Sequence, residues 1–326
     1  QSGTSKPKKA SHMQYPSMGN TGIRVSTVGL GTNQFGGKVD QDGVKDIIDA
    51  ALGAGVNLID TADVYQSGRS ETTLGVALKG RWDRVVLATK VYNSTGDGTN
   101  DKGASRYHIM SAVEASLRRL QTDHIDLYQI HRWDSETPIE ETLRALNDLV
   151  GAGKVRYVGA SNFAAWQLAR ANLLAEFRGW SPFVTIQNHY HMLERDLERE
   201  MLPYCEAYTV GILPYFPLAG GFLTGKYQRG EPAPSGSRGE SSSYVQRYMT
   251  DANYTKIEAL TDWAEAHSHT MAELAHAWLL AHPQVCSVIS GATKVAHVEA
   301  NAASADWELS ETDLAEINTV LGEAVP

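Results

Sequence analysis

The chain has 326 residues, of which 42% are hydrophobic and 21% are charged, and its formal net charge is -9. These values are those of a globular protein with room for one large α/β barrel or two smaller domains. The acidic balance argues against nucleic acid as the main partner, and no apolar run approaches the roughly 18 residues needed to cross a membrane. Two cysteines, Cys205 and Cys286, are too few for a disulfide framework and favour a reducing, cytoplasmic setting.

Residues 1–12 differ in character from the rest of the chain. They are rich in Ser and Lys, have no apolar periodicity and precede Met13, a plausible native start. They hold three lysines and no acid, so the remaining chain carries about -12. We therefore interpret residues 1–12 as an expression-tag remnant and residues 13–326 as one domain.

Two patterns alternate along that domain, after a short hairpin predicted at 15–25 around the turn 19–22. Runs rich in Val, Ile and Leu predict buried strands at 28–30, 56–60, 85–90, 125–130, 155–158, 183–187, 210–213 and 285–289. Apolar residues at three- and four-residue spacing predict helices at 41–54, 70–79, 105–121, 138–151, 163–174, 194–208, 251–267, 270–281, 295–303 and 310–323.

Eight strands with helices between nearly all of them favour a single closed (β/α)8 barrel, with an N-terminal β-hairpin closing its bottom and extra C-terminal helices. An open doubly wound sheet is the competing fold, but no G-x-G-x-x-G follows the first strand. Residues 228–244, rich in Gly, Pro and Ser, predict a long loop of the kind that is usually functional.

Four titratable residues follow three successive predicted strands: Asp60 and Tyr65, Lys90, and His131. Each alone is most often a cap, a packed ring, a surface charge or a structural histidine. Together, at the C-terminal rim of a barrel, they can deliver a proton to a carbonyl that accepts a hydride. A nearby ammonium should lower the high pKa of the Tyr65 phenol, and Asp60 could hold that ammonium in place.

The later strand ends are also polar. Ser161, Asn162 and Gln187 suit a carboxamide, and Tyr215 suits a flat heterocycle. The turn around Gly291 leads into a helix N-terminus, a geometry that binds phosphate, and Lys294 adds a positive charge there. The alternative interpretation is that Gly291 only permits the turn and that Lys294 is an exposed surface residue.

These motifs, in this order, resemble the aldo-keto reductase superfamily, in its bacterial branch near the potassium-channel β subunits. The resemblance spans nearly everything after residue 12 and rests on residues 29–32, 60–65, 89–90, 129–131, 159–163, 215–227 and 291–293. It implies a barrel that binds NADP(H), preferring NADPH to NADH, without a Rossmann fold. It also implies Tyr65 as general acid/base, Asp60 and Lys90 as the groups that tune it, and His131 as the residue that orients the substrate.

The same resemblance implies a set of cofactor residues from the nicotinamide to the adenosine end: Gly31, Thr32, Ser161, Asn162, Gln187, Tyr215, Pro217, Leu218, Gly220, Lys226, Arg238, Gly291, Thr293, Lys294, His297 and Asn301. Ala300 departs from the pattern, since relatives often carry a Glu there that contacts adenine. The 228–244 loop would close over the pyrophosphate. The residues predicted to wall the substrate pocket are Asn33, Gln34, Tyr92, Asn93 and Trp133. For Trp133, simple packing under a loop is an equal alternative.

The predicted function is NADPH-dependent, reversible reduction of a small-molecule aldehyde or ketone, with no metal. One alternative is a regulatory subunit that binds NADPH and turns over slowly; His131 argues against it, because the channel subunits carry Asn there. The other is a metal-dependent hydrolase built on the His189-x-His191 pair, with His131 and Asp60 as further ligands. The placement is poor, because the pair lies beyond the sixth strand and lacks a carboxylate neighbour at the right strand end. The sequence predicts neither the substrate nor the oligomeric state.

Overall fold

The computed structural model describes residues 13–322. The predicted tag remnant, 1–12, and the last predicted helical residue, 323, lie outside this range. Eight strands form the sheet: β1 (Val28–Gly31), β2 (Leu58–Asp60), β3 (Val86–Val91), β4 (Ile125–Ile130), β5 (Val155–Ser161), β6 (Phe183–Gln187), β7 (Gly211–Ile212) and β8 (Val288–Gly291).

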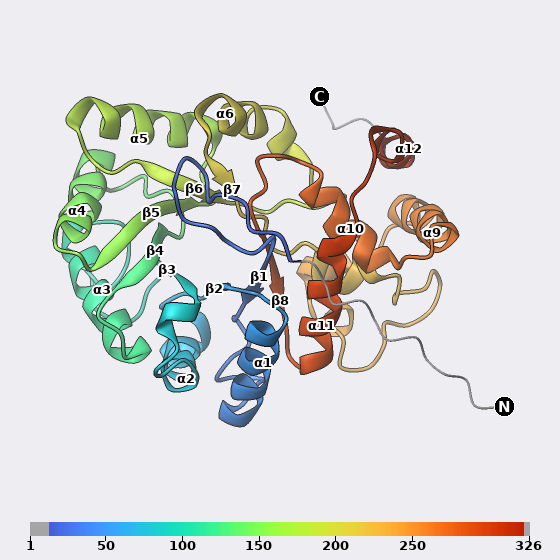
Figure 1. The fold of residues 1–326 in the computed structure, drawn as a ribbon, viewed down its shortest axis with the longest axis horizontal. Coiled ribbons are helices and arrows are strands. Elements are labelled where there is room, and N and C mark those ends of the chain that lie inside the picture. Colours follow the sequence, from blue (N-terminus) through green and yellow to red (C-terminus); the bar gives the residue numbers. More distant parts are fainter. Residues whose placement is uncertain (1–12, 323–326) are drawn as a thin grey trace.

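All strand pairs are parallel, in the order β7-β6-β5-β4-β3-β2-β1-β8. Two isolated parallel bridges, Ile212 to Val285 and Tyr215 to Ile289, join the ends of this sheet. The sheet is therefore closed, and the predicted (β/α)8 barrel is confirmed (Figure 1). Parallel closure places all strand C-termini, and so the predicted functional residues, at one rim.

The barrel interior is filled by small and branched apolar side chains rather than being a pore. Leu58, Ala88, Leu127 and Ile289 pack there in one buried cluster. The N-terminal hairpin adds Met18 and Val25 to that cluster from below. Its backbone pairs through Met18 N–H to the Ile23 carbonyl at 3.0 Å, and Figure 1 shows it crossing the barrel axis.

Close approach explains two glycines at the hairpin. A Cβ on Gly19, whose φ is +60°, would lie 2.2 Å from the Val184 carbonyl oxygen. A Cβ on Gly211 would lie 2.8 Å from the Gly19 nitrogen. These glycines let the hairpin sit directly against β6 and β7 and close the bottom of the barrel.

Twelve α-helices surround and extend the barrel: α1 (Gln41–Gly53), α2 (Arg69–Ala77), α3 (Arg106–Leu120), α4 (Ile139–Gly151), α5 (Ala165–Arg178), α6 (Met201–Tyr208), α7 (Arg238–Ser241), α8 (Ser243–Gln246), α9 (Asp251–Ala266), α10 (Met271–Leu280), α11 (Val295–Ala303) and α12 (Glu311–Leu321), within the described residues. Short 3-10 turns are η1 (Tyr65–Gly68), η2 (Trp82–Arg84), η3 (Asp196–Glu198), η4 (Ala219–Thr224) and η5 (Ser304–Asp306). Ser310 and Asp313 form a capping box on α12.

Three predicted elements differ from the structure. The helix predicted at 194–208 is the turn η3 followed by α6, because Pro203 is tolerated only in the first turn of a helix. The helix predicted at 163–174 runs from Ala165 to Arg178 and ends where Gly179 adopts a left-handed φ of +66°. The 228–244 loop contains the short helix α7 and enters α8.

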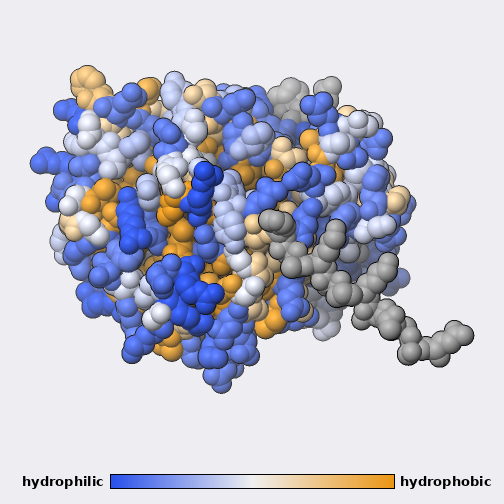
Figure 2. Space-filling view, viewed as in Figure 1, coloured by the Kyte–Doolittle hydropathy of each residue, from blue (hydrophilic) through white to orange (hydrophobic). Residues whose placement is uncertain are grey.

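The bounds of several strands also differ slightly from those predicted. β2 begins at Leu58 because Asn57 turns its side chain to the hairpin, accepting from the Ser26 N–H at 2.7 Å. β7 has two residues instead of four, and β8 begins at Val288 instead of 285. Hydrophilic residues cover most of the face seen in Figure 2, and no helix among residues 13–322 is both long and apolar enough to cross a membrane.

Candidate active site

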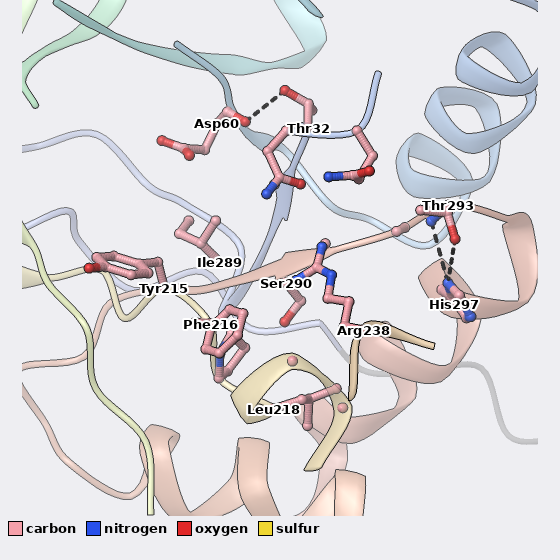
Figure 3. Close-up of a pocket in the computed structure, with 18 of the residues that line it drawn as sticks. Thr32, Asp60, Tyr215, Phe216, Leu218, Arg238, Ile289, Ser290, Thr293 and His297 are labelled. Carbon is pink, nitrogen blue, oxygen red and sulfur yellow. Dashed lines mark hydrogen bonds between the residues drawn. The ribbon is translucent and has the colours of Figure 1, made fainter. Parts of the chain in front are cut away.

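One cavity of about 730 Å³ opens at the C-terminal rim of the barrel. This volume lies within the range of cofactor and substrate sites. In Figure 3, Asp60 and Tyr215 lie at one end, Thr293 and His297 at the other, and Arg238 and Ser290 between them. The pocket is therefore elongated, with a titratable end and an end at the start of α11.

Asp60 and Lys90 form a buried ion pair at the first end. The Lys90 ammonium donates to Asp60 Oδ2 at 2.6 Å and to the Thr61 carbonyl at 2.9 Å. Both side chains are almost fully buried. Burial alone would lower the pKa of Lys90, but the negative charge of Asp60 and the proximity of Tyr65 outweigh it, so that pKa is raised. Lys90 is therefore a fixed cation.

Tyr65 lies directly beside this cation, since the Lys90 Nζ is 5.2 Å from the centroid of its ring. Lys90 lowers the pKa of the Tyr65 phenol, as the sequence predicted. Burial raises that pKa by more, however, and Asp60 adds to the rise, so the predicted net lowering is wrong. In this environment Tyr65 holds its proton and is a donor.

His131 lies beside Tyr65, with the two rings edge-to-face at a centroid distance of 5.9 Å. Burial, followed by the positive charges of Lys90 and Arg132, lowers the pKa of His131 to about 3. The imidazole is therefore neutral near pH 7. The Asn93 amide nitrogen lies 3.2 Å from His131 Nδ1, so that nitrogen accepts, and the ring proton belongs on Nε2.

Two glutamines hold the other oxygen of the Asp60 carboxylate. Gln187 donates to Asp60 Oδ1 at 2.8 Å and Gln129 donates to it at 3.2 Å. Gln129 belongs to the motif at 129–131, but no role was predicted for its side chain. The sequence feature that points to a role is the alternation of side chains along β4, which puts Gln129 on the same interior face of the barrel as Leu127. A polar residue at an interior barrel position indicates a buried partner.

A second chain of hydrogen bonds connects the ends of β5 and β7. The Tyr215 hydroxyl donates to Asn162 Oδ1 at 2.8 Å, and the Asn162 amide donates to the His131 carbonyl at 2.9 Å. Asn162 itself has a left-handed φ of +55°, which asparagine tolerates better than most residues. Ser161 donates to the Gln187 carbonyl at 2.7 Å. These bonds fix the Tyr215 ring relative to His131.

Cations without acidic partners collect in the rest of the pocket. Lys38, Arg132, Lys226 and Arg238 line it, and none forms an ion pair within residues 13–322. The only carboxylate among the lining residues is Asp60, which Lys90 already neutralises. In an acidic protein this local excess favours a polyanionic ligand. Lys38 and Arg132 were not predicted as pocket residues, because a loop sequence does not show in which direction its side chains point.

Residues 228–248, here called the covering segment, lie over the pocket. Gly236, Ser237 and Arg238 contribute to its lining. The segment is structured internally, because the Gln246 side-chain amide donates to the Gly239 carbonyl at 3.0 Å. It packs on η4, where a Cβ on Gly220 would lie 2.4 Å from Val245.

The structure gathers most of the predicted site residues around this one pocket. Those lining it are Asp60, Tyr65, His131, Gly31, Thr32, Ser161, Asn162, Gln187, Tyr215, Pro217, Leu218, Gly220, Lys226, Arg238, Gly291, Thr293, His297, Asn301, Asn33, Gln34 and Asn93. Lys90 stands behind Tyr65. Lys294 is the N-cap residue of α11 and lies outside the lining, but its charge helps to lower the pKa of His297, after the effect of burial.

Two residues predicted to wall the substrate pocket do not line it. Trp133 packs against the rings of Phe163 and Trp166, at centroid distances of 5.2 and 5.7 Å. Tyr92 packs against the buried apolar cluster beneath the rim. The described wall near Tyr65 is therefore more polar than the sequence predicted, with Asn33, Gln34 and Asn93.

The His189-x-His191 pair is part of an aromatic cluster, with the two rings 4.7 Å apart. Among residues 13–322 no group of three or more His, Cys, Asp or Glu side chains is arranged to hold a metal ion.

Comparison with known proteins agrees with this geometry. The model of the "Aldo/keto reductase family" matches residues 27–321. The chain is a member of the aldo/keto reductase family. Its relatives in this family include both enzymes and channel-associated proteins.

Three relatives illustrate that range. A "Probable voltage-gated potassium channel subunit beta" from Arabidopsis thaliana is 37% identical over 302 residues, covering 90% of this chain and 92% of the relative. The "Versiconal hemiacetal acetate reductase" of Aspergillus parasiticus is 36% identical over 309 residues, covering 86% and 90%. "Aldo-keto reductase YhdN" of Bacillus subtilis (strain 168) is 36% identical over 324 residues, covering 96% and 95%.

Proposed function

We propose that this aldo/keto reductase family member is a cytoplasmic NADPH-dependent carbonyl reductase, reducing an aldehyde or ketone to an alcohol with a proton from Tyr65. One observation carries the proposal. Tyr65 lies beside the buried Lys90–Asp60 pair, at one end of a pocket whose remainder gathers cations without acidic partners in the described residues. The first feature suits carbonyl protonation and the second suits a phosphate-rich cofactor.

The proton chemistry follows from the arrangement of three charges. As a carbonyl oxygen gains negative charge, Tyr65 gives it a proton and becomes a phenolate. The fixed Lys90 ammonium, which is itself fully buried, stabilises that phenolate electrostatically. Asp60 keeps Lys90 charged and in place, and Gln129 and Gln187 keep Asp60 in place.

His131 would orient the substrate rather than supply the proton. Its neutral ring with a proton on Nε2 can donate a hydrogen bond to the same carbonyl oxygen. The two donors, Tyr65 and His131, would together define where the reacting oxygen sits.

The cofactor, when bound, supplies the hydride from its nicotinamide ring. Ser161, Asn162 and Tyr215 would hold that ring, since an amide, a hydroxyl and an aromatic face lie together at the β5 and β7 ends. Lys38, Lys226 and Arg238 would hold the phosphates. Lys294 with His297 near α11 would favour the 2′-phosphate of NADPH.

The test is NADPH and NADH oxidation by the purified protein across a panel of aldehydes and ketones, with cofactor affinity measured separately. We expect reduction with NADPH and a preference over NADH. Tight NADPH binding without turnover of any carbonyl would instead favour a regulatory subunit, the alternative that the channel-subunit relatives support. Absence of both binding and turnover would refute the proposal.

A further inference from the structure

An aromatic cluster lies behind the Tyr215 ring, on the side away from the pocket. His189 stacks on Tyr215 with a centroid distance of 5.4 Å and an interplanar angle of 11°. Tyr215 lines the pocket and His189 does not, so His189 covers the ring face opposite the pocket. We call His189, Tyr215, Phe216, Tyr244 and Tyr248 the His189 cluster.

Two tyrosines of the covering segment reach into this cluster. The Tyr244 hydroxyl lies 3.0 Å from His189 Nδ1, and the Tyr248 hydroxyl lies 3.5 Å from His189 Nε2. The Tyr244 ring also meets Phe216 edge-to-face at 5.1 Å. The covering segment therefore contacts the Tyr215 support directly, through side chains that the reaction itself does not use.

The C-terminal part of the covering segment is held firmly to the barrel. Arg247 pairs with Glu194 at 2.7 Å and lies 4.2 Å from the Tyr244 ring centroid. Tyr248 donates to the same Glu194 carboxylate at 2.8 Å. Several contacts thus fix where Tyr244 meets His189, which makes the meeting point reproducible rather than incidental.

The contacts continue from His189 into the catalytic end. Tyr215 donates to Asn162, and Asn162 donates to the His131 carbonyl. One continuous path of stacked rings and hydrogen bonds therefore links Tyr244 on the covering segment to His131 beside Tyr65. Each link is a contact at an ordinary hydrogen-bond or stacking distance.

We propose that His189 is a positioning residue that couples the covering segment to the Tyr215 ring through its hydrogen bond with Tyr244. Closure of the segment over the cofactor and placement of the nicotinamide against Tyr215 would then be one event. This inference rests on the proposed function for its cofactor, but the His189–Tyr244 contact joins two groups of the protein itself and can be tested without NADPH.

The first experiment is hydrogen exchange of the covering segment in the cofactor-free protein, comparing wild type with Tyr244→Phe, His189→Phe and His189→Leu. His189→Phe keeps a ring for stacking and removes the hydrogen bond; His189→Leu removes both. We expect amides of 238–248 to exchange about three- to tenfold faster in Tyr244→Phe and His189→Phe, the range expected for one neutral hydrogen bond, and faster again in His189→Leu.

The second experiment measures NADPH release by stopped-flow fluorescence and the kcat of carbonyl reduction. We expect release to accelerate by the same factor, and the Tyr244→Phe effect to vanish in a His189→Phe background, because the bond between the two side chains is already absent there. Tyr208→Phe, on an exposed ring of α6, is the matched control and should match wild type.

The outcomes separate the two proposals. Wild-type exchange and release rates in Tyr244→Phe and His189→Phe would overturn the coupling while leaving the reductase function standing. Additive effects in the double variant would also overturn it. A wild-type protein that binds no NADPH would refute the proposed function, while the exchange data would still decide whether His189 holds the covering segment.

Discussion

The Lys90 ammonium lies 2.6 Å from Asp60 Oδ2, and neither side chain reaches solvent appreciably. A buried pair of this kind is costly to split, because the remaining charge is left without compensation. The pair therefore joins stability to function: the contact that keeps Lys90 charged beside Tyr65 also keeps the barrel interior electrically balanced.

Asp60→Asn should destabilise the protein by about 3–5 kcal/mol, since it leaves the Lys90 charge buried without its partner. Urea denaturation at pH 7 measures this loss. The double variant Asp60→Asn with Lys90→Met should recover a large part of it, because no charge remains. If the single variant unfolds at the same urea concentration as wild type, the ion pair does not contribute this much to the free energy of unfolding.

Tyr65→Phe should lower kcat by about 10²- to 10⁴-fold, the usual contribution of a positioned general acid. NADPH affinity should change little, because the hydroxyl serves the substrate oxygen. Steady-state kinetics and a fluorescence titration with NADPH measure the two quantities. Full activity in this variant would remove Tyr65 from the proton step.

His131 should show no protonation step between pH 5 and 8, because burial first, then Lys90 and Arg132, lower its pKa to about 3. The ring resonances of His131 in a pH titration by NMR should stay constant over that range. Asn93→Asp should change the tautomer, because a carboxylate accepts from Nδ1–H, and kcat should fall. A ring titrating near pH 6.5 would contradict the neutral donor role.

Much of the barrel and of this rim could be predicted from the sequence, for a physical reason. Buried parallel strands are short apolar runs, and a polar residue at the end of such a run has to lie at the rim. Asp60, Lys90 and His131 followed directly from that rule. Loops have no such periodicity, so the sequence could not show that Lys38 points inward, nor decide whether Trp133 walls the pocket or packs against other rings.

The direction of the net pKa shift of Tyr65 was predicted wrongly for a related reason. A sequence shows that a lysine is near, but the effect of burial depends on how completely the rim is closed. The His189 cluster was not predicted from the sequence. His189 and Tyr244 are 55 residues apart in the chain and come into contact only in the folded protein.

Lys38→Ala and Lys226→Ala should each weaken NADPH binding, because both cations line the pocket without an acidic partner in the described part of the chain. The affinity should also depend less steeply on salt in each variant, since screening then removes less attraction. Titrations at two ionic strengths measure both effects. Lys79→Ala, at an exposed site two residues beyond α2, is the control and should match wild type.

Asp63 should change the pH dependence of stability in the opposite direction from most carboxylates. It is 2% exposed, and within residues 13–322 no side chain donates a hydrogen bond to it. Burial, and then the neighbouring Glu71, raise its pKa to about 8. In the unfolded chain an aspartate titrates near its ordinary value of about 3.9.

Between about pH 4 and pH 8 the folded protein therefore holds a proton on Asp63 that the unfolded chain has released. Its contribution to the free energy of unfolding is full below pH 4 and falls as pH rises to about 8. Asp63→Asn cannot ionise, so relative to wild type it should gain on the order of a few kcal/mol between pH 4 and pH 8. Urea denaturation at both pH values measures this gain, and Asp262→Asn, an exposed carboxylate on α9, should show none. A variant whose stability follows wild type in parallel across that range would mean that Asp63 is already ionised in the folded barrel.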